Sequence, residues 1–320
     1  MTTVADGLFQ YGGQPVGVSL EISKLFSTKH PQGKGRAWFV DASSGVSGDG
    51  RSPNRAFGTM QEAFDNIASG DIIYFVGKVA EQLVTPVQIF DVTVVGCGNR
   101  PRHADATPAG GNWAASQWGA PASGAVVGQA TVRVLQQGWR FVNILFTMGD
   151  ATAAGVEVVR NAASGDDERD GSHCEILGCR FAGAGIGVRS GVAGLFTENV
   201  FNVKVEGCTF NLNTLAMSSS AGFGGNGWQI LSNMFWGNTS NIKMALANSI
   251  IKGNVIGPFT AASNSGGIDL AGGTAGNVVT LNYLSGTYSS AGGYTVAGAG
   301  DEWGGNMNSI AGGWTAADPA

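Results

Sequence analysis

A short motif that recurs through the second half of the chain constrains the fold more than any other feature. Each copy has an apolar residue, then a Cys or Asn three positions later, then a large apolar residue two positions after that. The copies are Ile176-x-x-Cys179-x-Phe181, Val205-x-x-Cys208-x-Phe210, Ile230-x-x-Asn233-x-Phe235, Ile251-x-x-Asn254-x-Ile256 and Val279-x-x-Asn282-x-Leu284, after a looser Asn143-x-x-Phe146. The steps of 29, 25, 21 and 28 residues are typical of a solenoid, whose repeats bury apolar faces against their neighbours. Since long helical periodicity is absent after residue 70, the motif predicts the coils of a parallel β-helix.

The motif also predicts a register. The large apolar residues should form one inward column, with the Cys and Asn residues aligned at the adjacent corner. There an asparagine could adopt a left-handed backbone and bond to the next coil. The outward ladders are then Leu177, Glu206, Leu231, Lys252, Thr280 and Glu175, Lys204, Gln229, Ile250, Val278. Glu175 should pair with Lys204 across the strands, and the outward apolar residues indicate burial against another subunit.

Composition fits an all-β chain with many tight turns. Glycine accounts for 52 of 320 residues, proline for 9 and charged residues for 13%, against norms of ~7% for glycine and ~25% for charged residues. The net charge of −5 and the lack of a basic stripe argue against nucleic-acid binding. The spacing of Cys97, Cys174, Cys179 and Cys208 suits neither a disulfide framework nor a zinc site, so we expect reduced, buried thiols and no metal or cofactor.

The N-terminal sequence lacks the features of a secretory signal. Residues 1–13, MTTVADGLFQYGG, have no basic or long apolar region. No apolar run reaches the ~18 residues of a membrane span. We therefore expect a protein made in the cytoplasm, without membrane association.

The chain divides into three parts. Residues 1–36 form an irregular arm, residues 37–284 the β-helix and residues 285–320 a Gly/Ala/Ser-rich end structure. Within the β-helix, Thr59-x-x-Glu62 is a capping box that starts a capping helix near residues 59–69, with Gly70 as its C′ residue. Residues 104–130, rich in Pro, Gly and Ala, are expected to be a loop insertion.

The segment from Phe39 to Glu81 supports a family resemblance. Its FVDASSG and GDGRSPNRAFGTMQEAFDNIASGDIIYFVGKVAE runs resemble the N-terminal cap and first coil of right-handed β-helix proteins of the pectate-lyase-like superfamily. The preceding GLFQYGGQPVG resembles the start of bacteriophage structural proteins with a short particle-binding arm. The resemblance implies an all-β, right-handed parallel β-helix. Because the superfamily includes lyases, tailspike depolymerases, adhesins and virion spikes, the fold does not choose the function.

The arm and the missing export signal favour a non-enzymatic structural protein of a phage particle, as a capsid decoration or spike. We expect a virion location, a homo-oligomer, in particular a trimer, and contacts with capsid or tail proteins through Phe9, Tyr11 and Pro15. Host-surface polysaccharide is a further candidate partner. The alternative is a tailspike-type protein that binds or depolymerises polysaccharide.

Two groups of residues are candidates for subunit or glycan contacts. Trp113 and Trp118 stand in the expected insertion, where they could pack the loop, contact a neighbouring subunit or stack on sugar rings. Asp166 and Asp170 belong to an acidic run with Asp167 and Glu168. A solvated turn is the first interpretation of that run; a calcium or trimer-axis site and a catalytic pair are the alternatives. No catalytic residue is assigned.

Overall fold

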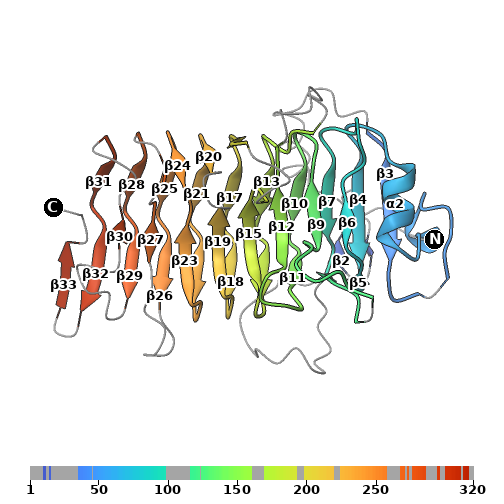
Figure 1. The fold of residues 1–320 in the computed structure, drawn as a ribbon. Coiled ribbons are helices and arrows are strands. Elements are labelled where there is room, and N and C mark those ends of the chain that lie inside the picture. The colour runs from blue at the N-terminus through green and yellow to red at the C-terminus, as the bar shows by residue number, and fades with distance from the viewer. Residues whose placement is uncertain are drawn as a thin grey trace.

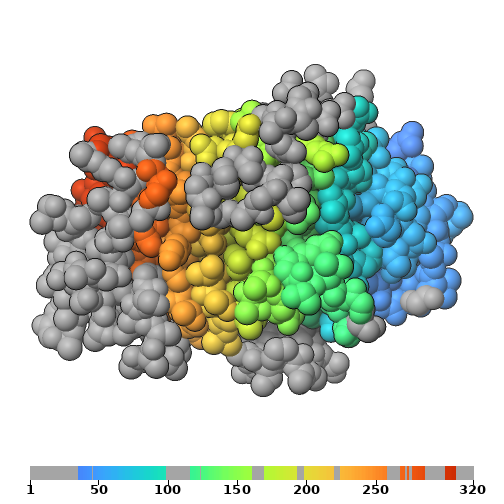
Figure 2. All heavy atoms as spheres, in the orientation of Figure 1, coloured from blue at the N-terminus to red at the C-terminus, as the bar shows by residue number. Residues whose placement is uncertain are grey.

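The computed structural model describes most of the chain. The described residues are 10–11, 14–15, 35–44, 46–98, 116–122, 124–160, 169–192, 198–219, 224–257, 267–270, 272–273, 276–285, 294–295, 300–310 and 313–316. Strands dominate them and run in successive coils along one axis, with α2 (Met60–Asn66) at the N-terminal end (Figure 1). In the space-filling view, successive segments cross the molecule as bands (Figure 2).

Three long sheets form the sides of the helix. Sheet 1 contains β3 (Ala37–Asp41), β4 (Ile72–Val76), β7 (Thr93–Gly96), β10 (Arg140–Val142), β13 (Glu175–Leu177), β17 (Lys204–Glu206), β21 (Gln229–Leu231), β25 (Ile250–Lys252), β28 (Val278–Thr280) and β31 (Glu302–Gly304). Sheet 2 contains β5 (Lys78–Ala80), β8 (Gln117–Gly119), β11 (Leu145–Thr147), β14 (Arg180–Ala182), β18 (Thr209–Asn211), β22 (Met234–Trp236), β26 (Val255–Gly257), β29 (Tyr283–Ser285), β32 (Met307–Ile310) and β33 (Gly313–Ala316). Sheet 3 contains β6 (Leu83–Val84), β9 (Val132–Val134), β12 (Ala154–Val158), β15 (Ile186–Ser190), β19 (Leu215–Ser219), β23 (Ser240–Lys243), β27 (Ile268–Asp269) and β30 (Tyr294–Thr295).

The pairing within these sheets is parallel except at the last strand of sheet 2, where β33 runs antiparallel to β32. A small parallel sheet of β16 (Val200–Phe201), β20 (Gly225–Asn226) and β24 (Leu246–Ala247) precedes sheet 1 in three coils. A short 3₁₀ helix, η1 (Pro53–Arg55), follows β3, and β1 (Gln10–Tyr11) pairs with β2 (Gln14–Pro15) near the N-terminus. The parallel β-helix expected from the repeat is confirmed.

Aromatic rings stack inside sheet 2 as the motif predicted. The ring centroids of Phe146 and Phe181 are 5.1 Å apart, and those of Phe181 and Phe210, and of Phe210 and Phe235, are 4.8 Å apart, with planes within 9° of parallel. Ile256 and Leu284 continue the column in register. All six side chains are fully buried. The column is the centre of the core.

The corner between sheets 1 and 2 carries a ladder of amides. The Asn254 Oδ1 accepts hydrogen bonds from the backbone and side-chain nitrogens of Asn233, at 2.9 and 3.0 Å. Asn282 repeats the contact with Asn254 at 3.0 and 2.8 Å, and Asn306 adds a further rung. Cys179 and Cys208 occupy the same position in earlier coils, buried and reduced. Asn233, Asn254 and Asn282 therefore each bond to the amide of the next coil, as the sequence predicted.

The conformation expected of these asparagines was wrong. The left-handed residue at this corner is the one before each Cys or Asn: Gly178, Gly207, Ser232, Gly253, Leu281 and Gly305, with φ between 54° and 68°. Glycine suits that position because it has no Cβ to clash there. The preceding residue thus makes the turn, while the asparagine is free to point inward and bond.

The capping helix has the predicted start. Thr59 accepts from the Glu62 amide, and the Glu62 carboxylate accepts from the Thr59 amide, which completes the capping box. The helix ends earlier than expected, at Asn66 with Ile67 as its C-cap. Gly70 is therefore not its C′ residue, although its φ of 85° makes it a left-handed turn before β4.

Two predicted boundaries differ from the structure. The expected insertion 104–130 contains β8, which is a sheet 2 strand paired with β5 and β11. The coils also continue past Leu284, because β31 pairs with β28 and β32 pairs with β29. The C-terminal copy was missed because Trp303-x-x-Asn306-x-Asn308 ends in a polar residue where the motif has a large apolar one.

Candidate functional site

The outward face of sheet 3 carries a column of charged side chains that sequence reasoning missed. The strand registers align Arg133, Glu157, Arg189, Ser218, Lys243 and Asp269 on successive rungs. The sequence signal was a charged residue between two buried valines, as in Val132-Arg133-Val134 and Val156-Glu157-Val158. The Cys/Asn motif lies on sheets 1 and 2 and has no copy on sheet 3, so it predicts no register there.

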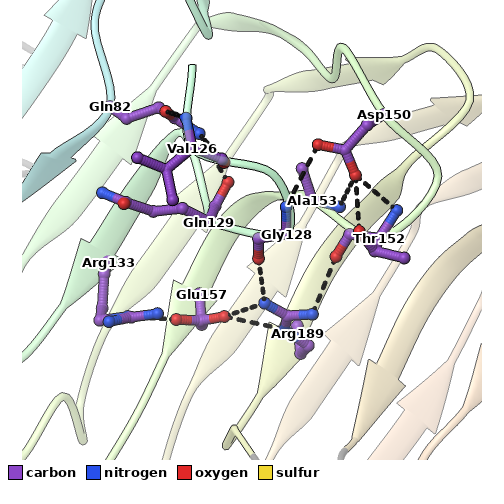
Figure 3. Close-up of polar contacts among 10 residues, drawn as sticks. All are labelled: Gln82, Val126, Gly128, Gln129, Arg133, Asp150, Thr152, Ala153, Glu157 and Arg189. Carbon is purple, nitrogen blue, oxygen red and sulfur yellow. Dashed lines mark hydrogen bonds and ion pairs between the residues drawn. The ribbon is translucent and has the colours of Figure 1, made fainter. Parts of the chain in front are cut away.

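Glu157 is the centre of this column and is fully buried. Arg133 donates from Nε to one carboxylate oxygen, and Arg189 donates from Nε to the other at 2.8 Å and also from Nη2 (Figure 3). Because both oxygens are bonded and shielded from solvent, this carboxylate has no free face for a substrate. Its arrangement is that of a structural ion triad.

A loop folded over the column completes the burial. Arg189 also donates to the carbonyl oxygens of Thr152 at 3.0 Å and Gly128 at 3.2 Å. Gln82 holds the same loop by bonding the backbone of Val126 and Gln129 at 2.7–3.0 Å (Figure 3). The triad therefore joins three coils and one loop into a single unit.

The turn beside this loop has a strongly bonded carboxylate. Asp150 accepts from the backbone and hydroxyl of Thr152 at 2.8 and 2.7 Å, from the Ala153 amide at 2.8 Å and from the Gly128 amide at 3.3 Å. Burial alone would raise the pKa of Asp150, but these hydrogen bonds outweigh it and lower the pKa. Asp150 thus stays ionised and fixes the loop.

A second group of polar residues surrounds a hollow of about 410 Å³ at the corner before sheet 1. Three successive coils contribute its lining, which is Phe90, Asp91, Gln137, Gly138, Arg140, His173 and Glu175. Arg140, in β10, is mostly buried and donates from Nε to Glu175 at 2.6 Å. Neither Asp91 nor His173 makes a side-chain hydrogen bond to another described residue.

The predicted contact residues do not come together. Trp118 is wrong as a surface contact: it lies in β8, is fully buried in the core column, stacks on Phe146 and donates from Nε1 to the Glu81 carbonyl at 3.0 Å. A large apolar residue in a Gly/Ala-rich segment was a strand residue, not a loop residue. Trp113, Asp166 and Phe9 lie outside the described residues. Tyr11 and Pro15 lie in the β1–β2 hairpin.

Asp170 is described and is engaged with its own chain. Its carboxylate accepts from the Ser172 amide at 2.8 Å and from Gln137 at 3.1 Å, and Arg160 lies 3.4 Å away. The first interpretation, a turn, fits these contacts better than a catalytic pair does.

The predicted Glu175–Lys204 pair is replaced by two others. Glu175 and Lys204 are neighbours in register. The ion pairs formed are Arg140–Glu175 at 2.6 Å and Lys204–Glu206 at 2.5 Å. The buried Arg140 is a stronger partner because its guanidinium is partly desolvated, and it lies one rung before Glu175, where the predicted outward ladder began.

Two kinds of element, metal-ligand clusters and membrane-spanning helices, are absent from the described parts of the chain. No cluster of three or more His, Cys, Asp or Glu side chains among those residues could hold a metal ion. None of the helices there is long and apolar enough to span a membrane.

Comparison with solved structures identifies the fold. The pectin methylesterase from Aspergillus niger matches with a TM-score of 0.54 and 15% identity, over 89% of this chain and 90% of that one. Two similarities with lower TM-scores are the A-module of a mannuronan C-5 epimerase from Azotobacter vinelandii (0.41; 13% identity; 95% and 98% covered) and the ORF18 protein of Geobacillus virus E2 (0.37; 15% identity; 91% and 63% covered). No protein-family model and no curated protein sequence matches the chain. The likeness to the methylesterase extends to the fold alone, and the chain is a right-handed parallel β-helix.

Proposed function

We infer that the chain is a non-enzymatic structural protein of a bacteriophage particle, as a capsid decoration or spike. The observation that carries this proposal is the state of Glu157. On the outward face of sheet 3, the central carboxylate of the charged column is fully buried and saturated by Arg133 and Arg189. Such a group ties coils together and is not available for acid–base chemistry. The GLFQYGGQPVG arm supports the placement on a particle by its resemblance.

Deletion of residues 1–36 tests the anchoring role. The truncated chain should remain a folded, β-rich protein by circular dichroism and should fail to join particles assembled without the full-length chain. Substitution of Phe9, Tyr11 and Pro15 by alanine should weaken incorporation in the same direction. Normal incorporation of the truncated protein would contradict the proposal.

An apolar column on sheet 2 supports a homo-oligomer within that proposal. Met234, Val255, Tyr283 and Met307 occupy consecutive outward rungs and are 38–42% exposed. In a ring of copies with parallel helix axes, each rung would meet the same rung of its neighbour, so the columns would cover one another. Val255→Asp should shift a trimer toward monomer in sedimentation equilibrium; a wild-type monomer would contradict the trimer.

The hollow beside sheet 1 favours a second candidate function, tailspike-type polysaccharide binding or depolymerisation. It has an exposed aromatic ring beside several convergent polar side chains. A capsule-digestion assay separates the two candidates. Digestion by the wild type that Asp170→Ala abolishes, without loss of folding, would overturn the non-enzymatic proposal.

A further inference from the structure

The hollow of about 410 Å³ is built at one corner of three successive coils. Asp91, Gly138 and His173 occupy equivalent positions before β7, β10 and β13, and all three have positive φ, of 57°, 76° and 61°. The middle residue has no side chain. A Cβ on Gly138 would lie 2.0 Å from the Asp91 Oδ1, so the Asp91 carboxylate can lie over this corner only because residue 138 is glycine.

The side chains at this corner are costly for the backbone. Later coils place Asn202, Gly227, Asn248 and Gly276 at the same corner. Glycine is relaxed in the left-handed region and aspartate or asparagine visits it, whereas a histidine is strained there. Asp91 and His173 thus retain functional groups at a position where glycine would be more stable, and both groups face the hollow without a hydrogen-bond partner among the described residues. Such strain is characteristic of binding sites.

The charge of the hollow restricts its ligand. Arg140 and Glu175 neutralise each other at 2.6 Å, which leaves Asp91 as a net negative charge. An anionic ligand would be repelled here.

The remaining chemistry suits a ring with several hydroxyl groups. The Asp91 carboxylate can accept from hydroxyls, and His173 can donate and accept. Phe90, 37% exposed, offers an apolar face beside them. The volume lies within the ~300–1,000 Å³ of small-molecule sites.

We propose that the hollow formed by Phe90, Asp91, Gln137 and His173 binds a neutral saccharide unit, without cleaving it. The proposal adds a sugar contact to the structural role proposed above. It places that contact at the corner before sheet 1 and not on the charged face of sheet 3.

Saturation-transfer NMR and calorimetry on the full chain test the proposal. The probes are tetrasaccharides of glucose, galactose, mannose and N-acetylglucosamine, with a galacturonic acid tetrasaccharide as the acidic comparison. At least one neutral tetrasaccharide should bind, and the acidic one should bind more weakly. Asp91→Asn and His173→Asn should each raise the dissociation constant about tenfold or more, as expected for loss of a hydrogen bond to a charged or polar group. Asparagine tolerates the left-handed backbone, so both variants should fold.

Asn248→Gly, at the same corner three coils after His173, is the matched control and should bind like the wild type. The proposal is overturned if none of the neutral tetrasaccharides binds, if the acidic one binds as tightly, or if the Asp91 and His173 variants keep wild-type affinity. Particle incorporation of Asp91→Asn is measured separately and should be normal. Failure of sugar binding and failure of the structural role are therefore distinguishable.

Discussion

The rings of Phe181 and Phe210 lie with centroids 4.8 Å apart and planes 8° from parallel, although 29 residues separate them in the sequence. Each ring is fully buried and belongs to its own coil. The contact exists because parallel pairing fixes the register of one coil on the next, which repeats every inward position at the rung spacing of ~4.8 Å. The stability of the solenoid therefore depends on such columns more than on any single coil.

Phe210→Ala should lower the free energy of unfolding by about 3–5 kcal/mol. The rings on both sides, Phe181 and Phe235, are held by their own strand ladders, so the space left by the ring cannot collapse. Equilibrium urea unfolding followed by circular dichroism measures the loss. Val127→Ala, at a residue 80% exposed, is the control and should stay within ~0.5 kcal/mol of the wild type. An equal effect of both substitutions would mean that the column is not the centre of the core.

Asn254→Ala should be nearly as damaging, for a different reason. It removes the acceptor for two nitrogens of Asn233 and the donor to the Ile230 carbonyl. Each buried polar group left without a partner costs ~1–3 kcal/mol, so we expect a loss of about 2–5 kcal/mol in the same unfolding experiment. Asn248→Gly changes an exposed asparagine with a positive φ and should be close to neutral. Wild-type stability of Asn254→Ala would show that the ladder contributes little.

The sequence predicted these two features because each repeat carries its own copy of them. A periodic apolar residue and a periodic amide give both the fold and the register, including the inward column from Phe146 to Leu284. The Asn306 rung was not predicted because Asn308 stands where the other copies of the motif have a large apolar residue. The place of Trp118 in the inward column was not predicted either, because its coil has no Cys or Asn motif.

The two polar sites could not be predicted from the motif. The triad of Arg133, Glu157 and Arg189 unites residues separated by 24 and 32 positions, and it requires the register of sheet 3, where the motif has no copy. The hollow depends on the backbone conformation of Asp91, Gly138 and His173. A pattern of apolar and polar residues along the sequence does not give the backbone conformation of a corner or the shape of the surface beside it.

Alkaline pH should destabilise the N-terminal coils through Tyr74 and Cys97. Burial raises the pKa of Cys97 to about 12 from 9.0, and burial followed by the nearby Cys97 raises the pKa of Tyr74 to about 12 from 10.0. Above pH 9 the unfolded chain releases these protons while the folded chain retains them. Stability is therefore fully present below pH 9 and falls as the pH rises toward 12.

Urea midpoints at pH 8, 9, 10 and 11 measure this fall. The Tyr74→Phe/Cys97→Ala double variant cannot lose either proton, so its midpoint should decline less steeply than that of the wild type. Comparing the two slopes removes the contribution of surface lysines, which both proteins share. Identical slopes would mean that Tyr74 and Cys97 titrate alike in the folded and unfolded chains.

Glu157→Gln should distinguish a structural triad from a reactive carboxylate. The substitution keeps the shape of a fully buried side chain but removes the negative charge between Arg133 and Arg189. Breaking a buried ion pair from one side costs about 3–5 kcal/mol, and the unfolding free energy should fall by that amount. Replacing all three residues with Met, Leu and Met should recover most of the loss, because apolar residues of similar volume often substitute for such triads. Glu206→Gln removes the half-exposed partner of Lys204 and should cost no more than ~1 kcal/mol. If Glu157→Gln unfolded like the wild type while abolishing a polysaccharide-digesting activity, the carboxylate would be catalytic and the structural proposal would be wrong.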